Sequence, residues 1–554
     1  MSKKKGNTDP SSWWREGVFY QIYPRSFMDA DNDGTGDLRG IIEKLDYLND
    51  GTENSLGVDA LWLSPIFASP MYDFGYDVSD FTAIEPTFGT MEDFDELLSE
   101  AHKRNIRIVL DFVPNHTSHL HEWFKESRSS RDNPKRDWFI WRDPGSYLGR
   151  RPNNWQSVFG GPAWEWDEKT EQFYYHHFVP QQPDVNWRNP ELKQAMLDQM
   201  SFWFDKGVDG FRLDVINHIF KDDQFRSNPY CLGPRPYDMQ RHLYDKDLPE
   251  AVDIAKDMRA LADSYGTKGE RMLVGEVFIE DPEEAVAYYG DGTDGLNLCF
   301  FFNFCFNKYK AQQFRESVRT WERLLPSNAQ PTYFLSNHDL PGRHITRYGA
   351  LSEKNTQDRA RVSAMMLLTL RGTPFLYYGE EIGMRHLHIK KKDIKDPVGI
   401  RYWPLPVNRD RCRTPMQWDD SPGAGFTASG SPWLPINPNH TDINVAAQKD
   451  DPDSLYSYYR RLLWKRKTLP SLLRGDLTIL DDAPDRLFCY LRSHENETTM
   501  VTLNFSNRKE TLTIPDRGGT WEVVLSSHRD EGDSEKPGTV TIHPSEATLW
   551  IHKK

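Results

Sequence analysis

The sequence predicts an α/β protein: a (β/α)8 TIM barrel with a subdomain inserted after its third strand and an antiparallel β-sandwich at its carboxyl end. Short apolar runs of strand length alternate with helical stretches along most of the chain, which is typical of parallel βα units. Three of these runs end in a carboxylate, at Asp214, Glu276 and Asp339. Because the carboxyl ends of barrel strands meet on one face, where chemistry takes place, we expect these three acids to lie together.

Eight apolar runs are expected to form the barrel strands, since each has the length and composition of a buried strand. They cover residues 18–27, 60–67, 107–113, 210–214, 272–276, 296–304, 331–339 and 374–379. Helices are expected between or after them, among them residues 38–48, 190–206, 358–370 and 455–468. The last of these helices is expected to close the barrel.

Three segments depart from this alternation. Residues 114–184 are rich in Trp, Asn, Pro and charge and are expected to form the inserted subdomain. Residues 383–430, full of Arg, Pro and Asp, are expected to cover the active site. After residue 472 the chain changes to short alternating runs, which predict the β-sandwich. The expected domains are the barrel over residues 1–113 and 185–471, the insertion over 114–184 and the sandwich over 472–554.

Charge and composition restrict the partners. The chain has 554 residues and a formal net charge of −15, which argues against nucleic acid or an anionic membrane as a partner. No apolar run is long enough to span a membrane, and the first residues lack the apolar core of a signal peptide. The many aromatic residues suit a large core, and some of them could line a ligand cleft.

The cysteines indicate a reducing compartment. They are odd in number, scattered and without a CxxC pair: Cys231, Cys299, Cys305, Cys412 and Cys489. This distribution predicts free thiols in a cytoplasmic protein and argues against a disulfide framework or a zinc site.

The three strand-end acids have the chemistry needed to cleave a glycosidic bond. Two carboxylates are the minimum, one acting as acid and the other as nucleophile or base. A third fixed negative charge is useful because the sugar develops oxocarbenium character. Arg212 precedes Asp214 by two residues, so strand alternation places both side chains on one face, where the guanidinium would keep the carboxylate ionised. A single strand-end Asp could equally be a helix cap, but three such ends favour an active site.

Six runs carry a family resemblance. Residues 111–116 (DFVPNH), 210–217 (GFRLDVIN), 275–278 (GEVF) and 334–339 (FLSNHD) resemble, in order and spacing, the best-known sequence regions of the α-amylase superfamily, glycoside hydrolase family thirteen. Residues 182–186 (QPDVN) and 413–418 (RTPMQW) are similar to its oligo-1,6-glucosidase and α-glucosidase branch. The resemblance extends over most of the chain.

The resemblance implies a role for each acid. Asp214 corresponds to the nucleophile, Glu276 to the general acid/base and Asp339 to the group that stabilises the transition state. It also implies retention of anomeric configuration. The implied ligand is a small oligosaccharide or disaccharide, bound by a monomer or weak homo-oligomer.

The resemblance further implies a closed sugar pocket. Asp73 resembles the residue that pairs with an arginine behind the terminal glucose, and either Arg409 or Arg413 could supply that partner. A pocket closed in this way predicts removal of single glucose units from a non-reducing end. The other residues expected to contact or orient substrate are Tyr76, His116, Phe159, Phe178, Gln182, Arg212, Val215 and His338.

A loop after the first strand carries acids at alternate positions around a Gly turn: Asp29, Asp31, Asp33 and Asp37. Oxygens in this pattern can wrap a hard cation, and the carbonyl of Thr35 could add one more. The loop is similar to the first half of an EF-hand, but position twelve is Gly40 and not Glu, which excludes a full EF-hand. A plain turn is the alternative. The resemblance implies one structural Ca²⁺.

The sequence leaves several activities open. Val215 follows Asp214 directly, and in similar enzymes a Val there accompanies α-1,6 bonds, although it is also simply a good strand residue. Transglycosylation or isomerisation would use the same intermediate, but the Arg-Leu-Asp-Arg-Asp loop of similar sucrose isomerases is absent. Hydrolysis of trehalose-6-phosphate would need basic groups, for which Lys390–Lys392 are candidates. A non-catalytic sugar-binding or transporter-associated protein is the alternative of another class.

Overall fold

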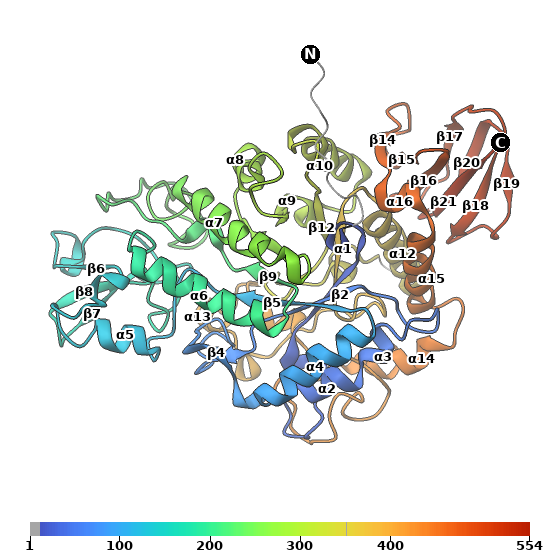
Figure 1. Ribbon diagram of the computed structural model, residues 1–554. Coiled ribbons are helices and arrows are strands. Elements are labelled where there is room, and N and C mark those ends of the chain that lie inside the picture. The colour runs from blue at the N-terminus through green and yellow to red at the C-terminus, as the bar shows by residue number, and fades with distance from the viewer. Residues whose placement is uncertain (1–11, 351) are drawn as a thin grey trace, which may run out of the picture.

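Eight parallel strands form the centre of the computed structural model, which describes residues 12–350 and 352–554 (Figure 1). The strands are β1 (Phe19–Ile22), β2 (Ala60–Leu63), β5 (Arg107–Phe112), β9 (Gly210–Leu213), β10 (Met272–Glu276), β11 (Leu298–Phe300), β12 (Thr332–Phe334) and β13 (Thr373–Tyr377). They pair in the order β12-β13-β1-β2-β5-β9-β10-β11, and β11 and β12 approach within 8 Å between Cα atoms. The predicted eight-stranded parallel barrel is confirmed. The polar start of the chain, on which the signal-peptide expectation rests, lies outside the described residues.

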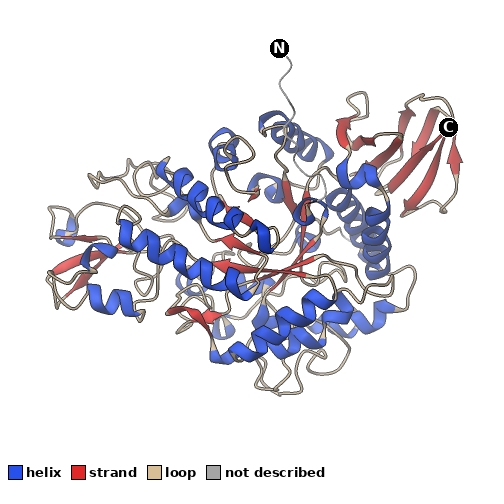
Figure 2. Ribbon diagram, in the orientation of Figure 1, coloured by secondary structure: helices blue, strands red, loops and turns tan. Residues whose placement is uncertain are grey.

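Helices cover the outside of the strand ring (Figure 2). Residues 190–206 form α6 (Pro190–Lys206) and residues 455–468 form α15 (Leu455–Thr468), both as predicted. The ends of α6 follow from sequence, because the Asn189 side chain accepts the amides of the first turn and Gly207 takes the left-handed conformation that ends the helix (φ 105°). Other barrel helices are α4 (Met91–Lys103), α7 (Glu250–Ser264), α10 (Ala311–Leu324) and α12 (Glu353–Thr369).

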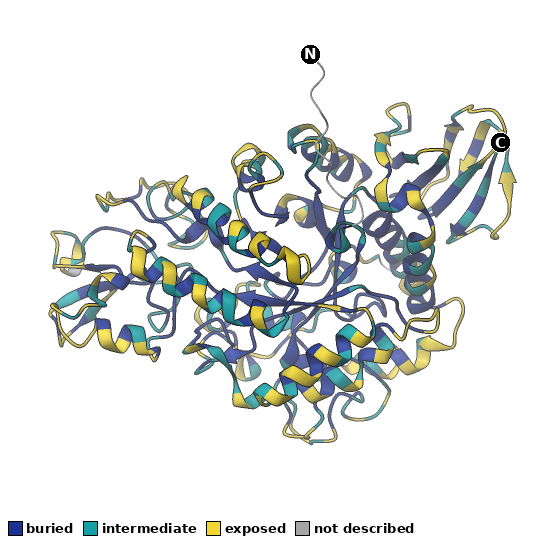
Figure 3. Cartoon of the chain, in the orientation of Figure 1, coloured by how far each residue is buried: buried dark blue, intermediate teal, exposed yellow. Residues whose placement is uncertain are grey.

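The barrel interior is a packed apolar core. Buried side chains from several strands meet in one cluster that includes Phe19, Trp62, Val109, Val274, Phe300, Phe334 and Phe375. The rings of Phe19 and Phe375 stack with centroids 4.4 Å apart. Figure 3 shows the central strands buried along their length. Since the interior is filled, polar chemistry is confined to the strand ends and the loops that follow them.

Some predicted boundaries were wrong. Residues 296–304 do not form one strand, because β11 ends at Phe300 and α9 (Phe302–Phe306) follows it; an apolar run of this length does not distinguish strand from buried helix. The strand expected to reach residue 339 ends at Phe334, and the following residues form a loop. The helix over 38–48 is divided into α2 (Leu38–Glu43) and α3 (Leu45–Leu48). The hairpin of β3 (Phe67–Ala68) and β4 (Asp80–Ile84) was not predicted.

Two further regions flank the barrel. Within residues 114–184, β6 (Trp141–Arg142), β7 (Trp164–Asp167) and β8 (Gln172–Tyr175) form a small antiparallel sheet, at the left of Figure 1. At the carboxyl end, antiparallel strands form a six-stranded sheet and a two-stranded one, β17 (Glu510–Ile514) with β20 (Gly538–Ile542). The six-stranded sheet contains β14 (Asp476–Ile479), β15 (Leu487–His494), β16 (Glu497–Asn504), β21 (Ala547–Lys553), β18 (Thr520–Ser526) and β19 (Ser534–Glu535). No helix within the described residues combines the length and apolarity needed to cross a membrane.

Candidate active site

A cavity of about 140 Å³ lies at the carboxyl ends of the barrel strands. Asp214 directly follows β9, Glu276 is the last residue of β10, and Asp339 lies in the loop after β12. The barrel therefore brings the three acids together on one face, as its geometry requires. The lining residues are Asp73, Tyr76, His116, Phe159, Phe178, Asp214, Val215, Glu276, Asp339 and Arg409. Every one of them was expected from the sequence; Gln182, Arg212, His338 and Arg413 lie behind this lining.

Arg212 holds two of the acids. Its side chain is buried, and Nη1 donates to Asp214 Oδ1 at 2.6 Å while Nη2 donates to Glu276 Oε2. Nη1 also donates to Asp111 Oδ1 at 2.7 Å. One guanidinium thus fixes three carboxylates, and the rigid plane of its donors sets their relative positions. Asp111 stands in a matched run of the sequence but was not predicted as a site residue.

Asp214 and Glu276 titrate as a pair. Burial raises the pKa of Glu276, and the charge of Arg212 opposes this. Burial also raises the pKa of Asp214, again opposed by Arg212 and reinforced by the charge of Glu276. The pair therefore gives up its last proton less readily than two separate carboxyls would, because two adjacent buried carboxylates do not both ionise readily. One proton shared by two carboxyls is what an acid and a nucleophile need together.

The backbone after Asp214 is strained. Val215 has φ 38° and ψ 44°, in the left-handed region, which is costly for a β-branched residue. This conformation directs the Val215 N–H at Glu276 Oε2, 3.3 Å away, and leaves the side chain in the pocket wall. The strain therefore supports the geometry of both acids.

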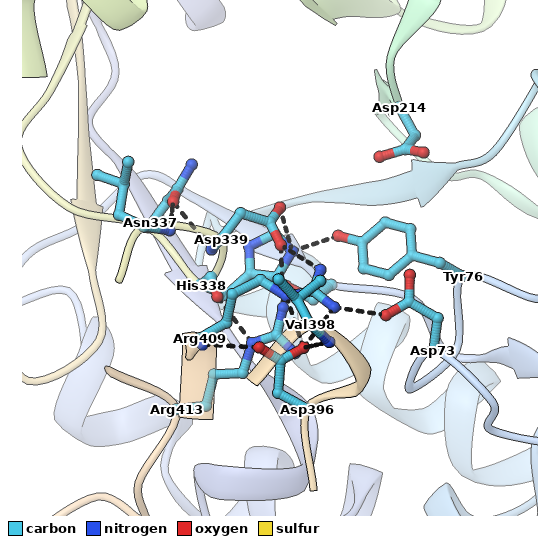
Figure 4. A network of polar contacts seen from close by, with 12 residues as sticks. Asp73, Tyr76, Asp214, Asn337, His338, Asp339, Asp396, Val398, Arg409 and Arg413 are labelled. Carbon is cyan, nitrogen blue, oxygen red and sulfur yellow. Dashed lines mark hydrogen bonds and ion pairs between the residues drawn. The ribbon is translucent and has the colours of Figure 1, made fainter. Parts of the chain in front are cut away.

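Asp339 is held by two arginines (Figure 4). Its Oδ1 accepts from Arg413 Nη2 at 2.9 Å and from Arg409 Nη1 at 3.2 Å. Burial acts to raise the pKa of Asp339, but the neighbouring charges outweigh burial and lower this pKa below its ordinary value. Asp339 is therefore ionised at neutral pH, as a stabiliser of positive charge must be.

Arg409 also closes the pocket. Its Nη2 donates to Asp73 Oδ1 at 2.7 Å, joining the loop after β3 to η9 (Arg409–Cys412). Of the two arginines that the sequence left open, Arg409 pairs with Asp73, while Arg413 contacts Asp339. The guanidinium of Arg409 lies over the ring of Phe159, 4.9 Å from its centroid. Segment 383–430 therefore contributes to the pocket.

Two histidines present neutral rings. Burial lowers the pKa of His116 to about 3 and lowers that of His338 well below its ordinary value. The Nδ1 atom of His338 lies 2.7 Å from Gln21 Nε2; when Gln21 donates here, the proton of His338 sits on Nε2, 3.1 Å from Asp339 Oδ2. The ring of Tyr76 is nearly parallel to that of His338, with centroids 5.6 Å apart.

Apolar side chains from three segments form the wall above the acids. Phe159 and Phe178 come from the inserted segment and Val215 from the end of β9, and all three line the pocket. Val398 from α13 (Pro397–Arg401) belongs to the same small cluster and packs with them outside the lining. Gln182 Nε2 lies 3.1 Å from His116 Nε2, behind this wall. Val398 was not predicted, because nothing in the sequence distinguishes it from other valines of this segment.

Three acids of the loop after β1 converge. Oxygens of Asp29, Asp31 and Asp37 lie within 4.8 Å of one another. Asp33 is not part of this group: its Oδ1 accepts the N–H of Thr35 at 2.6 Å, so the structure brings together three of the four predicted carboxylates. Asp37 also caps α2 by accepting the amide of Gly40. An all-oxygen cluster of this kind suits a hard cation.

Comparisons with known proteins agree with this architecture. A model of the alpha-amylase catalytic domain matches residues 21–475. The chain is 42% identical over 515 residues to a probable alpha-glucosidase of Rhizobium meliloti, covering 91% of each chain. It is 39% identical over 570 residues to an oligo-1,6-glucosidase of Parageobacillus thermoglucosidasius, covering 97% of this chain and 98% of that protein.

A solved structure extends the comparison. The crystal structure of an alpha-glucosyl transfer enzyme, XgtA, superposes with a TM-score of 0.89 at 39% identity, covering 98% of this chain and 99% of that one. Fold, strand-end acids and sequence similarity over nearly the whole length point to the same family. The chain belongs to the alpha-amylase family of glycoside hydrolases.

Proposed function

We propose that this protein is a retaining, exo-acting α-glucosidase that releases glucose from the non-reducing end of short α-glucosides. The observation that carries the proposal is the Asp73–Arg409 ion pair in the wall of a small pocket that also contains Asp214 and Glu276. A pocket blocked at this point has room for a terminal sugar and no path for a long chain. The site therefore favours cleavage of the outermost bond.

The proposed reaction proceeds in two steps through a covalent intermediate. Asp214 attacks the anomeric carbon, the bond to the leaving oxygen breaks, and Glu276 gives its proton to that oxygen. Glu276 then removes a proton from water, which attacks the same carbon and releases α-glucose and the free carboxylate of Asp214. Asp339 faces the positive charge that develops on the sugar. Arg212 holds Asp214 and Glu276 in place throughout.

The proposed preference for α-1,6 bonds rests on Val215 and on the name of one relative. Val215 lines the pocket beside both Asp214 and Glu276. The Parageobacillus relative is named an oligo-1,6-glucosidase. Beyond Glu276, the exposed ring of Phe278 packs edge-on against Phe302, with centroids 4.9 Å apart, and offers an apolar surface to the sugar on the other side of the bond.

Transfer of glucose to another sugar is the second candidate activity. The intermediate on Asp214 is the same, and only the acceptor differs. The name of XgtA, an alpha-glucosyl transfer enzyme of closely similar fold, favours keeping this alternative. Both activities release or transfer one glucose and share every residue of the pocket.

The acidic loop is proposed to hold one structural Ca²⁺. The residues fit this ion, since three carboxylates converge and the buried carboxylate of Asp29 is held in the loop by the N–H groups of Asn32 and Gly34. Asp29, Asp31 and Asp37 would hold it, joined by Asp33 and the carbonyl of Thr35 on a small rearrangement of the loop. The bound ion would neutralise the repulsion of the acids.

We also propose a cytoplasmic location, in keeping with five free cysteines. The proposed oligomeric state is a monomer or weak homo-oligomer.

A product profile tests the proposal. Isomaltose, maltose, sucrose, trehalose, trehalose-6-phosphate and soluble starch are each incubated with the protein, and the first-formed glucose is followed by proton NMR. Rapid release of α-glucose from the disaccharides, with starch left intact, is expected. Release of β-glucose would exclude the retaining mechanism, and cleavage inside starch would exclude the closed pocket. Longer saccharides formed from isomaltose or maltose would favour the transferase.

A further inference from the structure

Asp396 is a buried acid that does not line the pocket, yet it holds the arginine that closes it. Its carboxylate accepts three bonds from Arg409: Oδ2 from the backbone N–H at 2.9 Å, and Oδ1 from Nε at 3.0 Å and from Nη2 at 2.8 Å. The side chain is fully buried. The same carboxylate accepts the amides of Val398 and Gly399, so it also begins α13. Figure 4 shows Asp396 on the opposite side of Arg409 from Asp73.

The geometry of the guanidinium links Asp396 to the chemistry. Arginine presents its donors in one rigid plane, so fixing one edge determines where the other donors point. Asp396 accepts hydrogen bonds from Nε and Nη2 of Arg409. The other hydrogen bonds of the guanidinium are directed at the pocket: Nη2 also donates to Asp73 at 2.7 Å, and Nη1 donates to Asp339 at 3.2 Å.

A second buried acid ties the backbone of Asp396 to the same turn. Asp410, the residue after Arg409, accepts the N–H groups of Lys395 at 2.7 Å and of Asp396 at 2.9 Å through Oδ2. The two segments therefore hold each other reciprocally: Arg409 donates to Asp396, and the backbone beside Asp396 donates to Asp410. Such a closed arrangement leaves Arg409 little freedom to turn.

The charge of Asp396 is maintained by its partners. Burial acts to raise the pKa of Asp396, but Arg409 and Arg413 outweigh burial and lower it. Asp396 is therefore ionised at neutral pH and accepts a full charge-assisted bond from Arg409. Without this carboxylate, Arg409 would be shared by Asp73 and Asp339 alone and would have no partner on its Nε edge.

We infer that Asp396 is a positioning residue of the active site, which aims Arg409 at Asp73 and Asp339 without touching the sugar. This inference deepens the proposed function and rests on it, because it takes the pocket as the glucose site. Sequence patterns give no sign of it: Asp396 lies 13 residues before Arg409 in an irregular segment.

A double-variant cycle tests the inference with an aryl α-glucoside as substrate. Asp396→Asn keeps the size of the side chain but places an NH₂ group against the donors of Arg409. It should lower kcat/KM by about a hundredfold, the scale of a small misplacement in an active site. Arg409→Met should lose at least as much. Adding Asp396→Asn to Arg409→Met should then change kcat/KM less than about twofold, because coupled residues are not additive.

Additive losses in the double variant would overturn the inference, since Asp396 would then act by a route other than Arg409. Glu546→Gln is the matched control: Glu546 is equally buried, accepts from Arg529 Nε at 2.6 Å and lies in the carboxyl-terminal region. It should shift the melting temperature and leave kcat/KM unchanged. If Asp396→Asn does not fold, Asp396→Glu keeps the buried charge and enters the same cycle.

The cycle separates this inference from the proposed function. If the unaltered protein hydrolyses no aryl α-glucoside, the proposed function fails. In that case glucose binding, measured by titration calorimetry on the same four proteins, still measures the coupling between Asp396 and Arg409. A loss of affinity shared by the single variants and not deepened in the double variant would support the role of Asp396. Unchanged affinity in Asp396→Asn would overturn it.

Discussion

Asp73 and Arg409 lie 336 residues apart in the sequence and form an ion pair of 2.7 Å in the wall of the candidate active-site pocket. The loop after β3 supplies the acid and η9 supplies the arginine, so the pocket is closed only when both loops are in place. Asp73 is also buried, so the loss of either member would leave an unpaired charge away from water, which is costly.

Removing Asp73 should impair every short substrate alike. Asp73→Ala leaves Arg409 without one of its partners and removes a polar contact to the terminal glucose, so kcat/KM should fall by roughly a hundredfold or more. The measurement is kcat/KM on isomaltose, maltose and an aryl α-glucoside. Asp95→Ala, at an exposed ion pair with Lys206, is the control and should have no effect. A loss confined to one linkage would contradict the prediction.

The roles of Asp214 and Glu276 should be separable with azide. In Glu276→Ala the covalent intermediate still forms from an activated aryl α-glucoside, and azide attacks it to give the α-glucosyl azide. In Asp214→Ala azide replaces the missing nucleophile and gives the β-glucosyl azide. NMR of the products distinguishes the two. The same anomer from both variants would show that one assignment is wrong.

The barrel and its acids could be predicted from the sequence because one physical rule connects them. Parallel strands of a closed barrel carry their carboxyl ends to one face, so Asp214 and Glu276 converge at their strand ends, and Asp339 joins them from the short loop after β12. Helix α6 could be predicted equally well, since Asn189 and Gly207 mark its two ends.

The geometry of the loops could not be predicted in the same way. Arg409 and Arg413 stand four residues apart in an irregular segment, and no local pattern decides which of them faces Asp73. Asp33 belongs to the same alternation as Asp31, yet its carboxylate turns to the amide of Thr35. These outcomes depend on competition between nearby hydrogen-bond partners, which periodicity does not record.

Val215→Thr should change linkage preference more than overall activity. Val215 lines the pocket beside Asp214, and exchanging one methyl group for a hydroxyl alters transition-state binding by about 1–3 kcal/mol. The ratio of kcat/KM for isomaltose to that for maltose should therefore fall by about tenfold. Val179→Thr, in the same apolar cluster but outside the pocket lining, is the matched control. An unchanged ratio would remove the reason for preferring α-1,6 bonds.

The alkaline limb of the activity profile should depend on the leaving group. The active form carries a proton on Glu276, whose pKa is raised by burial. Because the protonated form is present below this raised pKa and lost above it, kcat/KM should fall as pH rises through it. Isomaltose, whose leaving group is poor, should show this fall; an aryl glucoside with a good leaving group should show it only weakly. Identical alkaline limbs would contradict the assignment of Glu276.

Chelation should lower stability without altering the chemistry. If one Ca²⁺ binds among Asp29, Asp31 and Asp37, an ion concentration near 100 times the dissociation constant stabilises the folded state by about 2.7 kcal/mol. EDTA should therefore lower the melting temperature, added Ca²⁺ should restore it, and kcat at a temperature well below melting should stay the same.

Two variants show whether that ion lies in this loop and whether Asp33 also binds it. Asp31→Ala should abolish the effect of EDTA on melting temperature, because it removes an exposed member of the cluster that has no role in capping α2. Asp33→Ala should weaken the effect only if Asp33 leaves the Thr35 amide to bind the ion. Asp46→Ala, an exposed acid paired with Arg104, is the control and should leave the response to EDTA intact. An Asp31→Ala protein that still responds fully to EDTA would place the ion elsewhere, and a protein that never responds would leave the loop as a hydrogen-bonded turn.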